Sequence, residues 1–275
     1  MKISRRDFIK TGAGGVLGGV VAYSLPSILR ILAQPGNAEL PVSAAVIGEP
    51  QWEKHHWGFI ADTEKCIGCG RCVVACKQEN KVPWDEEYNR TWVERYVITE
   101  DGETLVDSPN AGRDGFAEAT KNSEYQNLEI RKSFFVPKLC NQCEQPPCVT
   151  VCPVGATYRT KDGVVLVNQE HCIGCRYCVQ ACPYGARYML PDAAQTHFGQ
   201  VRVVDKCTWC YHRIQKGLLP ACVEVCPVGA RVFGDMRDPE SPVRKILREK
   251  RVYVLKPDLG TEPKVYYVGF EKGVH

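Results

Sequence analysis

Hydrophobic and polar positions follow different patterns at the two ends of the chain. From Thr11 to Leu29 the residues are uncharged and mostly apolar or small. A helix that crosses a membrane needs about 20 strongly apolar residues, and no comparable run follows Leu32, so the mature chain is not expected to span a membrane. Near the C-terminus, VYVLKPDLGTEPKVYYVGF alternates apolar and polar residues, which predicts strands that pack back on the preceding fold.

Two hairpins are predicted in the middle of the chain. RTWVERYVITEDGETLV places Asp101-Gly102 between two strand-like runs, and YRTKDGVVLVNQEHC places Asp162-Gly163 in the same setting. Asp-Gly between such runs is a strong hairpin signal. The first hairpin lies in an insertion over 87–130 that also contains polar, glycine-rich sequence and is long for a plain loop. A lobe that contacts a partner and a solvated insertion both remain open.

Residues 1–38 have the composition of an export signal. Paired Arg5-Arg6 in SRRDFIK precede a weakly apolar stretch diluted by glycine, and small residues follow. The pattern resembles the twin-arginine signal of bacteria and archaea, with cleavage near residue 38 or residue 44. An uncleaved N-terminal anchor is the alternative. Because this route exports folded proteins, it suits a cofactor inserted in the cytoplasm, and the expected location is the periplasm or the outer face of the cytoplasmic membrane.

The charge distribution argues against nucleic acid as a partner. The formal net charge is +3, but residues 1–38 hold five basic residues against one acidic residue. The remainder, with 30 basic and 31 acidic residues, has a net charge of −1. A protein that binds phosphates needs a basic face in its folded part.

Sixteen cysteines fall into four groups of four. The groups are Cys66, Cys69, Cys72 and Cys76; Cys140, Cys143, Cys148 and Cys152; Cys172, Cys175, Cys178 and Cys182; and Cys207, Cys210, Cys222 and Cys226. Groups one and three have the C-x2-C-x2-C-x3-C spacing of bacterial ferredoxins, which bind [4Fe–4S] clusters through thiolates. Gly68 and Gly174 let the loop curl and leave backbone N–H groups free to face sulfur. The fourth cysteine of each group is expected to begin a helix and to ligate the other cluster of a pair.

Zinc and disulfides are the competing explanations. Zinc favours separated C-x2-C pairs, and only group four has that form, so by itself it is open between zinc and a cluster. Disulfides are typical of small secreted domains, whereas this chain is long enough for a core and its spacings repeat regularly. Because the other three groups are interpreted as cluster motifs, we interpret group four as a cluster site as well.

Three repeated phrases indicate how the groups combine: CPVGATY (152–158), CPYGARY (182–188) and CPVGARVF (226–233). Groups two and three, joined by the second hairpin, form one two-cluster unit in which Cys152 and Cys182 cross over. Group one ends in Cys76-Lys77 rather than Cys-Pro. It therefore pairs most simply with group four, by exchange of Cys76 and Cys226, so that one unit is inserted in the other.

This arrangement resembles the four-cluster iron–sulfur subunits of the dimethyl sulfoxide reductase superfamily, over about residues 57–270. The resemblance implies an α+β fold of two bacterial-ferredoxin-like units with irregular loops and a β-rich C-terminal segment. It also implies four [4Fe–4S] clusters with these ligand sets: Cys66, Cys69, Cys72 and Cys226; Cys76, Cys207, Cys210 and Cys222; Cys140, Cys143, Cys148 and Cys182; and Cys152, Cys172, Cys175 and Cys178. The corresponding segments are 57–86, 131–162 and 163–192 for the first three motifs, 200–235 for the fourth group and 236–275 for the C-terminal extension.

The function implied is electron transfer without a catalytic site. The implied partners are a catalytic subunit, of the molybdopterin type, and an integral membrane quinone-reactive subunit or cytochrome. The alternatives are a stand-alone exported ferredoxin-like carrier, a subunit of a sulfur-metabolism membrane complex without a molybdopterin partner, and a zinc- or disulfide-stapled binding protein. No G-x-G-x-x-G opens a helix after a strand, so no nicotinamide or flavin is indicated.

Aromatic residues and histidines near the cysteines are expected to serve packing or the surface rather than ligation. We expect four aromatic side chains to exclude water from the clusters: Tyr177, Tyr184, Trp209 and Tyr211. The six histidines, including His55, His56 and His171, are scattered and are expected at the surface or in packing.

Overall fold

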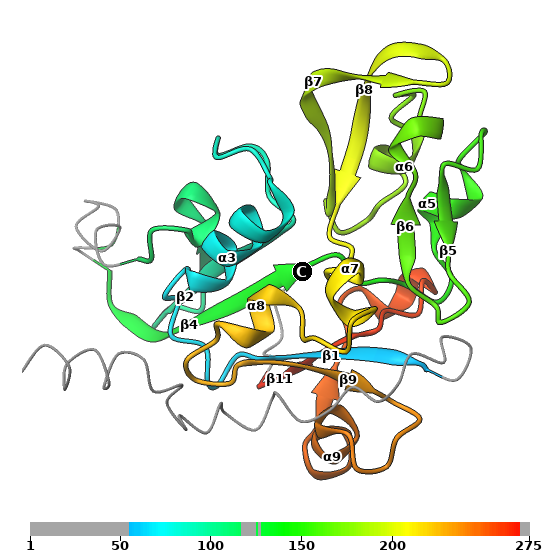
Figure 1. The fold of residues 1–275 in the computed structure, drawn as a ribbon. Helices are drawn as coiled ribbons and strands as arrows, with labels where there is room; N and C mark the ends of the chain where they lie inside the picture. Colours follow the sequence, from blue (N-terminus) through cyan, green and yellow to red (C-terminus); the bar gives the residue numbers. More distant parts are fainter. Residues whose placement is uncertain (1–54, 117–124, 126–127, 270–275) are drawn as a thin grey trace, which may run out of the picture. The chain divides into compact units, whose positions relative to one another are not determined.

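The structure is a computed structural model that describes residues 55–116, 125 and 128–269 (Figure 1). The predicted signal over 1–38 and both cleavage positions lie outside the described residues, as do parts of the 87–130 insertion and the last residues of the C-terminal extension. In the described part of the chain, no helix is long and apolar enough to cross a membrane. Helices and strands are mixed along the chain, which confirms the α+β class.

A four-stranded sheet joins the residues before the first cysteine group to those after the fourth. Its order is β10 (Val252–Tyr253), β11 (Val265–Val268), β1 (Trp57–Asp62) and β9 (Arg231–Asp235). β1 pairs in parallel with β11 and antiparallel with β9, so Phe59 lies opposite both Val265 and Phe233. Every residue of β1 is buried, and helix α9 (Pro242–Glu249) packs against β9 and β1. The predicted C-terminal strands are confirmed.

A three-stranded sheet forms much of the insertion between groups one and two. Its order is β3 (Thr104–Asp107), β2 (Thr91–Thr99) and β4 (Ile130–Leu139), all antiparallel, and a short 3-10 turn η4 (Pro109–Gly112) follows β3. The predicted Asp101-Gly102 hairpin is confirmed, with Gly102 at φ +89° and its N–H donating to the carbonyl of Thr99 over 3.1 Å. β4 runs directly into Cys140, so this sheet positions the second cysteine group.

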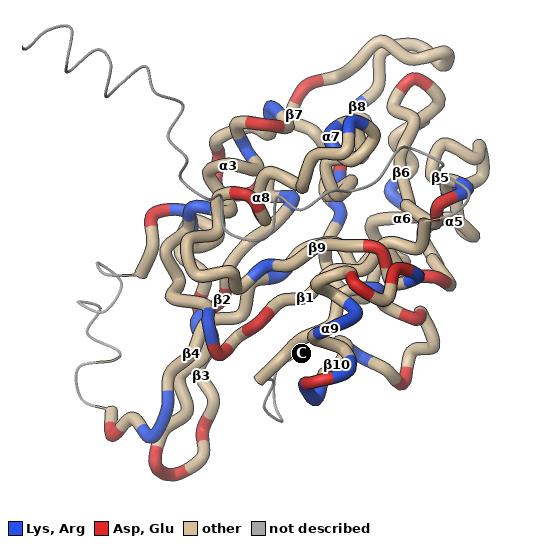
Figure 2. The backbone as a smooth tube through the Cα atoms, turned by 60° about the horizontal axis from the view of Figure 1, so that its bottom comes forward, with Lys and Arg blue, Asp and Glu red and all other residues tan. Residues whose placement is uncertain are grey.

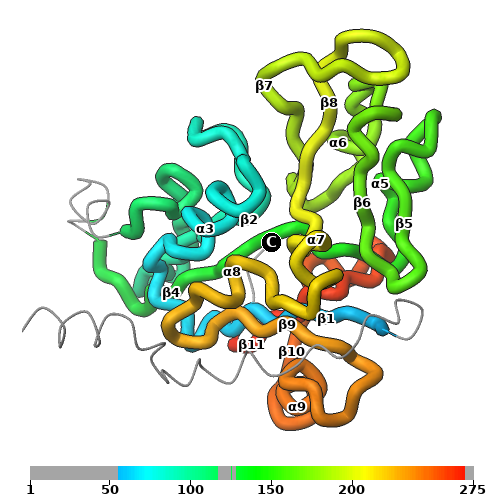
Figure 3. The backbone as a smooth tube through the Cα atoms, in the orientation of Figure 1, coloured from blue at the N-terminus to red at the C-terminus, as the bar shows by residue number. Residues whose placement is uncertain are grey.

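Two further hairpins flank the third cysteine group. The predicted Asp162-Gly163 hairpin is confirmed as β5 (Thr157–Arg159) and β6 (Val165–Val167). A longer hairpin that the sequence pattern did not predict, β7 (Arg187–Thr196) with β8 (Gly199–Lys206), connects groups three and four; the two strands run side by side (Figure 3). A 3-10 turn, η6 (Gln169–His171), precedes group three.

Each cysteine group is built around one short helix. These helices are α3 (Arg71–Asn80), α5 (Pro147–Thr150), α6 (Tyr177–Gln180) and α8 (Ala221–Glu224), and in each the second residue is the third cysteine of the group. α3 packs on α8, and α5 packs on α6. The expectation that the fourth cysteine begins a helix is wrong. Cys76 lies inside α3, and the other three fourth cysteines follow their helices by two residues, because the helix fills the three-residue spacer.

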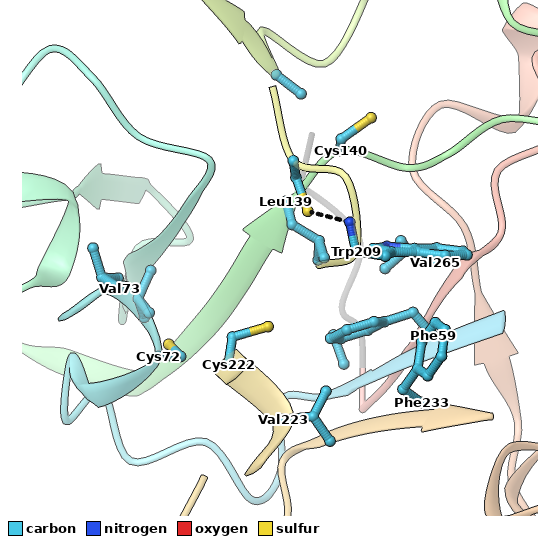
Figure 4. Packing of buried hydrophobic residues seen from close by; sticks show 14 of the residues in the cluster. Phe59, Cys72, Val73, Leu139, Cys140, Trp209, Cys222, Val223, Phe233 and Val265 are labelled. Carbon is cyan, nitrogen blue, oxygen red and sulfur yellow. Dashed lines mark hydrogen bonds between the residues drawn. The ribbon is translucent and has the colours of Figure 1, made fainter. Parts of the chain in front are cut away.

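Two hydrophobic clusters contain the cysteines, and a third, with Ile60, Val243 and Val268, lies under α9. The larger one places Trp209 between Phe59 and Phe233, with ring centroids 6.2 Å and 5.4 Å away (Figure 4). It also contains cysteines of groups one, two and four. The second cluster surrounds Cys148, Cys172 and Cys178 with valines of β6 and β8. Many of the cysteines are therefore part of the hydrophobic core, where surface disulfide bonds would not place them.

Charged residues are interspersed over the described elements (Figure 2). Helix α7 (Tyr211–Ile214) and the last 3-10 turn, η7 (Pro257–Leu259), complete the described fold. On α7, Arg213 donates to Glu79 of α3 over 2.9 Å, and His212 pairs with the same carboxylate at 2.7 Å. These contacts connect the segment between Cys210 and Cys222, which contains α7, to the helix of group one.

Candidate iron–sulfur centres

All sixteen cysteines are free thiols, and fourteen of them are buried or half-buried. The two exposed ones are Cys69 in group one and Cys175 in group three. Both occupy the second position of a C-x2-C-x2-C loop.

The four loops share one backbone conformation. Two residues after the first cysteine of each group, the chain is left-handed: φ is +65° at Gly68, +46° at Gln142, +67° at Gly174 and +54° at Trp209. At two of these residues the backbone N–H points at the first sulfur, at 3.5 Å for Gly174 to Cys172 Sγ and 3.4 Å for Trp209 to Cys207 Sγ. Such concave runs of N–H groups suit negatively charged sulfur.

Close packing explains why glycine is needed in groups one and three. A Cβ on Gly174 would lie 2.4 Å from the carbonyl oxygen of Arg202, and one on Gly68 would lie 2.6 Å from the Phe135 ring. Real Cβ contacts do not approach backbone atoms this closely, and a left-handed φ adds strain. Gln142 and Trp209 adopt the conformation in groups two and four, where tertiary contacts fix them.

Cys76 lies with three cysteines of group four. Burial raises the pKa of the Cys76 thiol, and the neighbouring Cys207, Cys222 and Cys210 raise it further. The amide nitrogen Nδ2 of Asn80 lies 3.6 Å from Cys76 Sγ and 3.6 Å from Cys210 Sγ. One side chain therefore hydrogen-bonds two thiols from distant parts of the sequence.

Cys226 lies with the first cysteines of group one. Burial raises the pKa of the Cys66 thiol to about 11, with smaller contributions from Cys72 and Cys226. The pKa of Cys72 is raised by burial and then by Cys226 and Cys69. The structure thus brings Cys226 into the neighbourhood of Cys66, Cys69 and Cys72.

Groups two and three exchange cysteines in the same way. Burial raises the pKa of Cys143 to about 12, and Cys140, Cys148 and Cys182 add to the shift. Cys182 in turn has its pKa raised by burial and by Cys140. The remaining fourth cysteine, Cys152, packs on the core cluster that contains Cys172 and Cys178, and its sulfur accepts from the backbone N–H of Thr157 over 3.4 Å.

Contacts between the sets place them in a linear order. Cys222 interacts with Cys72, which links the sets of Cys226 and Cys76 (Figure 4). Cys207 interacts with Cys140, and Gln142 Nε2 donates to the carbonyl of Cys207 over 2.8 Å, which links the set of Cys76 to that of Cys182. Arg187 interacts with Cys148, Cys178 and Cys140, which links the set of Cys182 to that of Cys152. Exposed Cys69 and Cys175 belong to the two ends of this series.

The cysteine sets fit [4Fe–4S] clusters by their donor chemistry. Each offers four thiols, the ligands that such clusters use, with N–H groups directed at sulfur. In the described residues, no group of three or more histidine, cysteine or acidic side chains could hold a single metal ion. A cubane is ligated at four separate irons, so its cysteines need not converge on one point. Because burial keeps the free thiols neutral, iron binding must displace protons.

The predicted packing role holds for some aromatic residues and fails for one. Trp209 is 1% exposed and packs as expected, whereas Tyr177 is 62% exposed and excludes no water from a neighbouring set. Tyr177 is the first residue of α6, a position that faces outward. His55 pairs with Asp235 at 2.7 Å, and the rings of His171 and His197 meet edge to face, which agrees with surface and packing roles for these histidines.

Several polar residues at the cysteine sets were not predicted from the sequence. Arg187 and Arg231 are 4% and 2% exposed and lie among thiols, and Gln142 is fully buried between groups two and four. A signal for the arginines was present: both occupy the residue after Gly-Ala in the repeated phrase. Nothing comparable in the sequence marks Gln142 or Asn80.

Comparison with known proteins identifies the class as a 4Fe–4S dicluster protein. Two family models, each described as a 4Fe-4S dicluster domain, match residues 65–156 and 131–236. A tetrathionate reductase subunit of Salmonella typhimurium is 40% identical over 220 residues, covering 79% of this chain and 74% of the relative.

Two other relatives match almost the full length. A selenate reductase subunit of Mesobacillus selenatarsenatis is 35% identical, over 96% of this chain and 97% of its own. An iron-sulfur subunit of an Hdr-like menaquinol oxidoreductase from Archaeoglobus fulgidus is 33% identical with the same coverage of both chains. The chain belongs to the family of iron–sulfur electron-transfer subunits of molybdoenzyme complexes, whose members are not the catalytic subunits.

Proposed function

We propose that this chain holds four [4Fe–4S] clusters in two ferredoxin-like units, one inserted in the other. The ligands are the four sets of cysteines whose first members in the sequence are Cys66, Cys76, Cys140 and Cys152. The observation that carries the proposal is that Cys76 lies near cysteines of group four and Cys226 lies near cysteines of group one. The pairing of β1 with β9 supports it, because it closes the outer unit around the inserted one.

The clusters would supply one-electron carriers when bound. The contacts among the sets support one route, from the set of Cys226 through those of Cys76 and Cys182 to that of Cys152. Buried side chains such as Trp209 exclude water along its middle. The exposed cysteines at its ends, Cys69 and Cys175, lie beside exposed Ile67 and Tyr177, which suits contact with redox partners.

The partners proposed for those ends are a molybdopterin-containing catalytic subunit and a membrane quinone-reactive subunit or cytochrome. The family supports membership in a multi-subunit reductase complex. A second candidate is a quinone-linked complex without a molybdopterin subunit. It is supported by the relative named as part of an Hdr-like menaquinol oxidoreductase, which matches nearly the whole chain.

Metal analysis of anaerobically purified protein tests the proposal. We expect about 16 iron and about 16 sulfide per chain, four of each for every all-thiolate cubane. About one zinc for each cysteine group, with little iron, would contradict it. The same analysis on the complex co-purified through a tag on this chain separates the two candidates, because only the first predicts molybdenum in stoichiometric amounts.

We also propose export by the twin-arginine route to the periplasm or the outer face of the membrane. The basis is the Arg5-Arg6 pair ahead of a weakly apolar stretch. The double variant Arg5→Lys, Arg6→Lys should remain in the cytoplasm with its clusters assembled, since folding and metal loading precede export. Cell fractionation with iron analysis measures this, and export of the double variant at the normal level would show that the arginine pair is incidental.

A further inference from the structure

Two arginines occupy equivalent positions in the two proposed units. Arg187 follows Cys182 by five residues in CPYGARY, and Arg231 follows Cys226 by five residues in CPVGARVF. Each is the first residue of a strand, β7 or β9, and each is nearly fully buried. Burial of a charged side chain is unfavourable by several kcal/mol unless opposite charge compensates it.

Arg231 has no carboxylate partner among the residues that the structure describes. One terminal nitrogen, Nη2, donates to Thr91 Oγ1 over 2.8 Å, and the other, Nη1, is buried without a hydrogen-bond partner. The groups that interact with the guanidinium are cysteines, with Cys72 and Cys222 the strongest. Cys72 and Cys222 belong to different sets, so Arg231 lies between two of them.

Arg187 repeats this arrangement in the other unit. Nη1 donates to Thr157 Oγ1 over 3.2 Å, and Nη2 is buried without a hydrogen-bond partner. Arg187 interacts with Cys148 and Cys178, again one cysteine from each of two sets. In both units, one terminal nitrogen of the guanidinium donates to a threonine hydroxyl, and the other has no hydrogen-bond partner and lies near cysteines.

Lys206 is another buried cation beside the cysteine sets, but its hydrogen bonds differ. Its ammonium donates to the carbonyls of Val165 and Cys207, the latter over 2.8 Å. Carbonyl oxygens therefore take part of its hydrogen-bonding capacity, and its chemistry is explained without a cluster. Arg187 and Arg231 instead each keep one buried terminal nitrogen without a hydrogen-bond partner, beside thiols of two sets.

We propose that Arg187 and Arg231 each hold a fixed positive charge between the two clusters of one unit and raise the reduction potentials of both. This inference rests on the proposed clusters. Reduction by one electron adds negative charge on either side of the guanidinium, breaks no bond and moves no proton, and a nearby fixed cation favours it. Placing one cation between two sites raises both potentials together, which keeps the step between them small.

The test compares Arg231→Gln and Arg187→Gln in EPR-monitored redox titrations of the loaded protein. Glutamine removes the charge but keeps a hydrogen-bonding side chain. We expect Arg231→Gln to disfavour reduction at least tenfold, which is 59 mV for a one-electron couple, at the sets of Cys226 and Cys76. Arg187→Gln should do the same at the sets of Cys182 and Cys152. Each variant is the control for the other.

Lysine variants separate charge from packing. Arg231→Lys and Arg187→Lys should shift the potentials less than glutamine does. If a glutamine variant binds fewer irons, the iron content of the matching lysine variant tests the role of charge. A normal iron content of the lysine variant supports that role, and an equal loss of iron overturns it. Unchanged potentials in loaded glutamine variants also overturn it. A wild-type protein without about 16 iron would instead defeat the proposed function itself, so the two failures are distinguishable.

Discussion

Serine at Cys76 should disturb the same cluster as serine at Cys222, although the two positions are far apart in the sequence. Cys76 lies with Cys207, Cys210 and Cys222, and Asn80 hydrogen-bonds sulfur from both segments. A serine oxygen is a harder and poorer ligand for iron than a thiolate. Each variant should therefore lose iron from this one site, between about one and four of about 16 irons, or shift its potential.

The cross-over predicts a different result for the neighbouring cysteine of group four. Cys226→Ser should disturb the cluster held by Cys66, Cys69 and Cys72, and should leave the signal altered by Cys222→Ser largely intact. EPR spectra followed through a redox titration identify the affected cluster, and iron analysis counts the loss. Val225→Ser is the matched control, because it places serine in the same turn without removing a ligand. Different clusters altered by Cys76→Ser and Cys222→Ser would show that the units are not split in this way.

The cysteine groups could be assigned from the sequence because ligation fixes their spacing. In groups one and three a tight loop can turn three sulfurs toward one cluster, and in groups two to four a Cys-Pro phrase marks the fourth cysteine. The Asp101-Gly102 and Asp162-Gly163 hairpins were predictable for a similar reason: each has a three-residue turn that ends in a glycine with positive φ, and such a turn is decided locally. Each of these features depends on a few adjacent residues.

Features that depend on distant contacts were not predictable. The β7–β8 hairpin turns through Thr196, His197, Phe198 and Gly199, which carries no strong two-residue turn signal. Gln142 takes the left-handed conformation that glycine has elsewhere because its amide is held at both ends, by the carbonyl of Cys207 and the N–H of Val165. The position of the fourth cysteine after the helix was missed because four-residue helices give too little sequence for a periodic pattern.

Trp209→Ala should be among the most destabilising single substitutions away from the ligands. Trp209 is 1% exposed and packs between Phe59 and Phe233, and its backbone N–H faces Cys207 Sγ. Truncation of a buried tryptophan lowers the free energy of unfolding by about 3–5 kcal/mol, because it removes contacts and leaves a cavity. Cluster loss makes unfolding irreversible, so the readout is the rate at which the iron–sulfur absorbance bleaches in urea, which should rise on the order of a hundredfold.

Two further substitutions at this position separate packing from backbone strain. Trp209→Phe keeps a ring against Phe59 and removes the indole N–H, which is buried without a partner, so its loss should be only about 1–2 kcal/mol. Trp209→Gly loses the same side chain as Trp209→Ala but relieves a φ of +54°, a conformation that costs non-glycine residues about 1 kcal/mol. The iron–sulfur absorbance of Trp209→Gly should therefore bleach no faster than that of Trp209→Ala, although a glycine substitution usually destabilises a protein more than an alanine substitution does. Faster bleaching of the glycine variant would show that the left-handed turn is not strained.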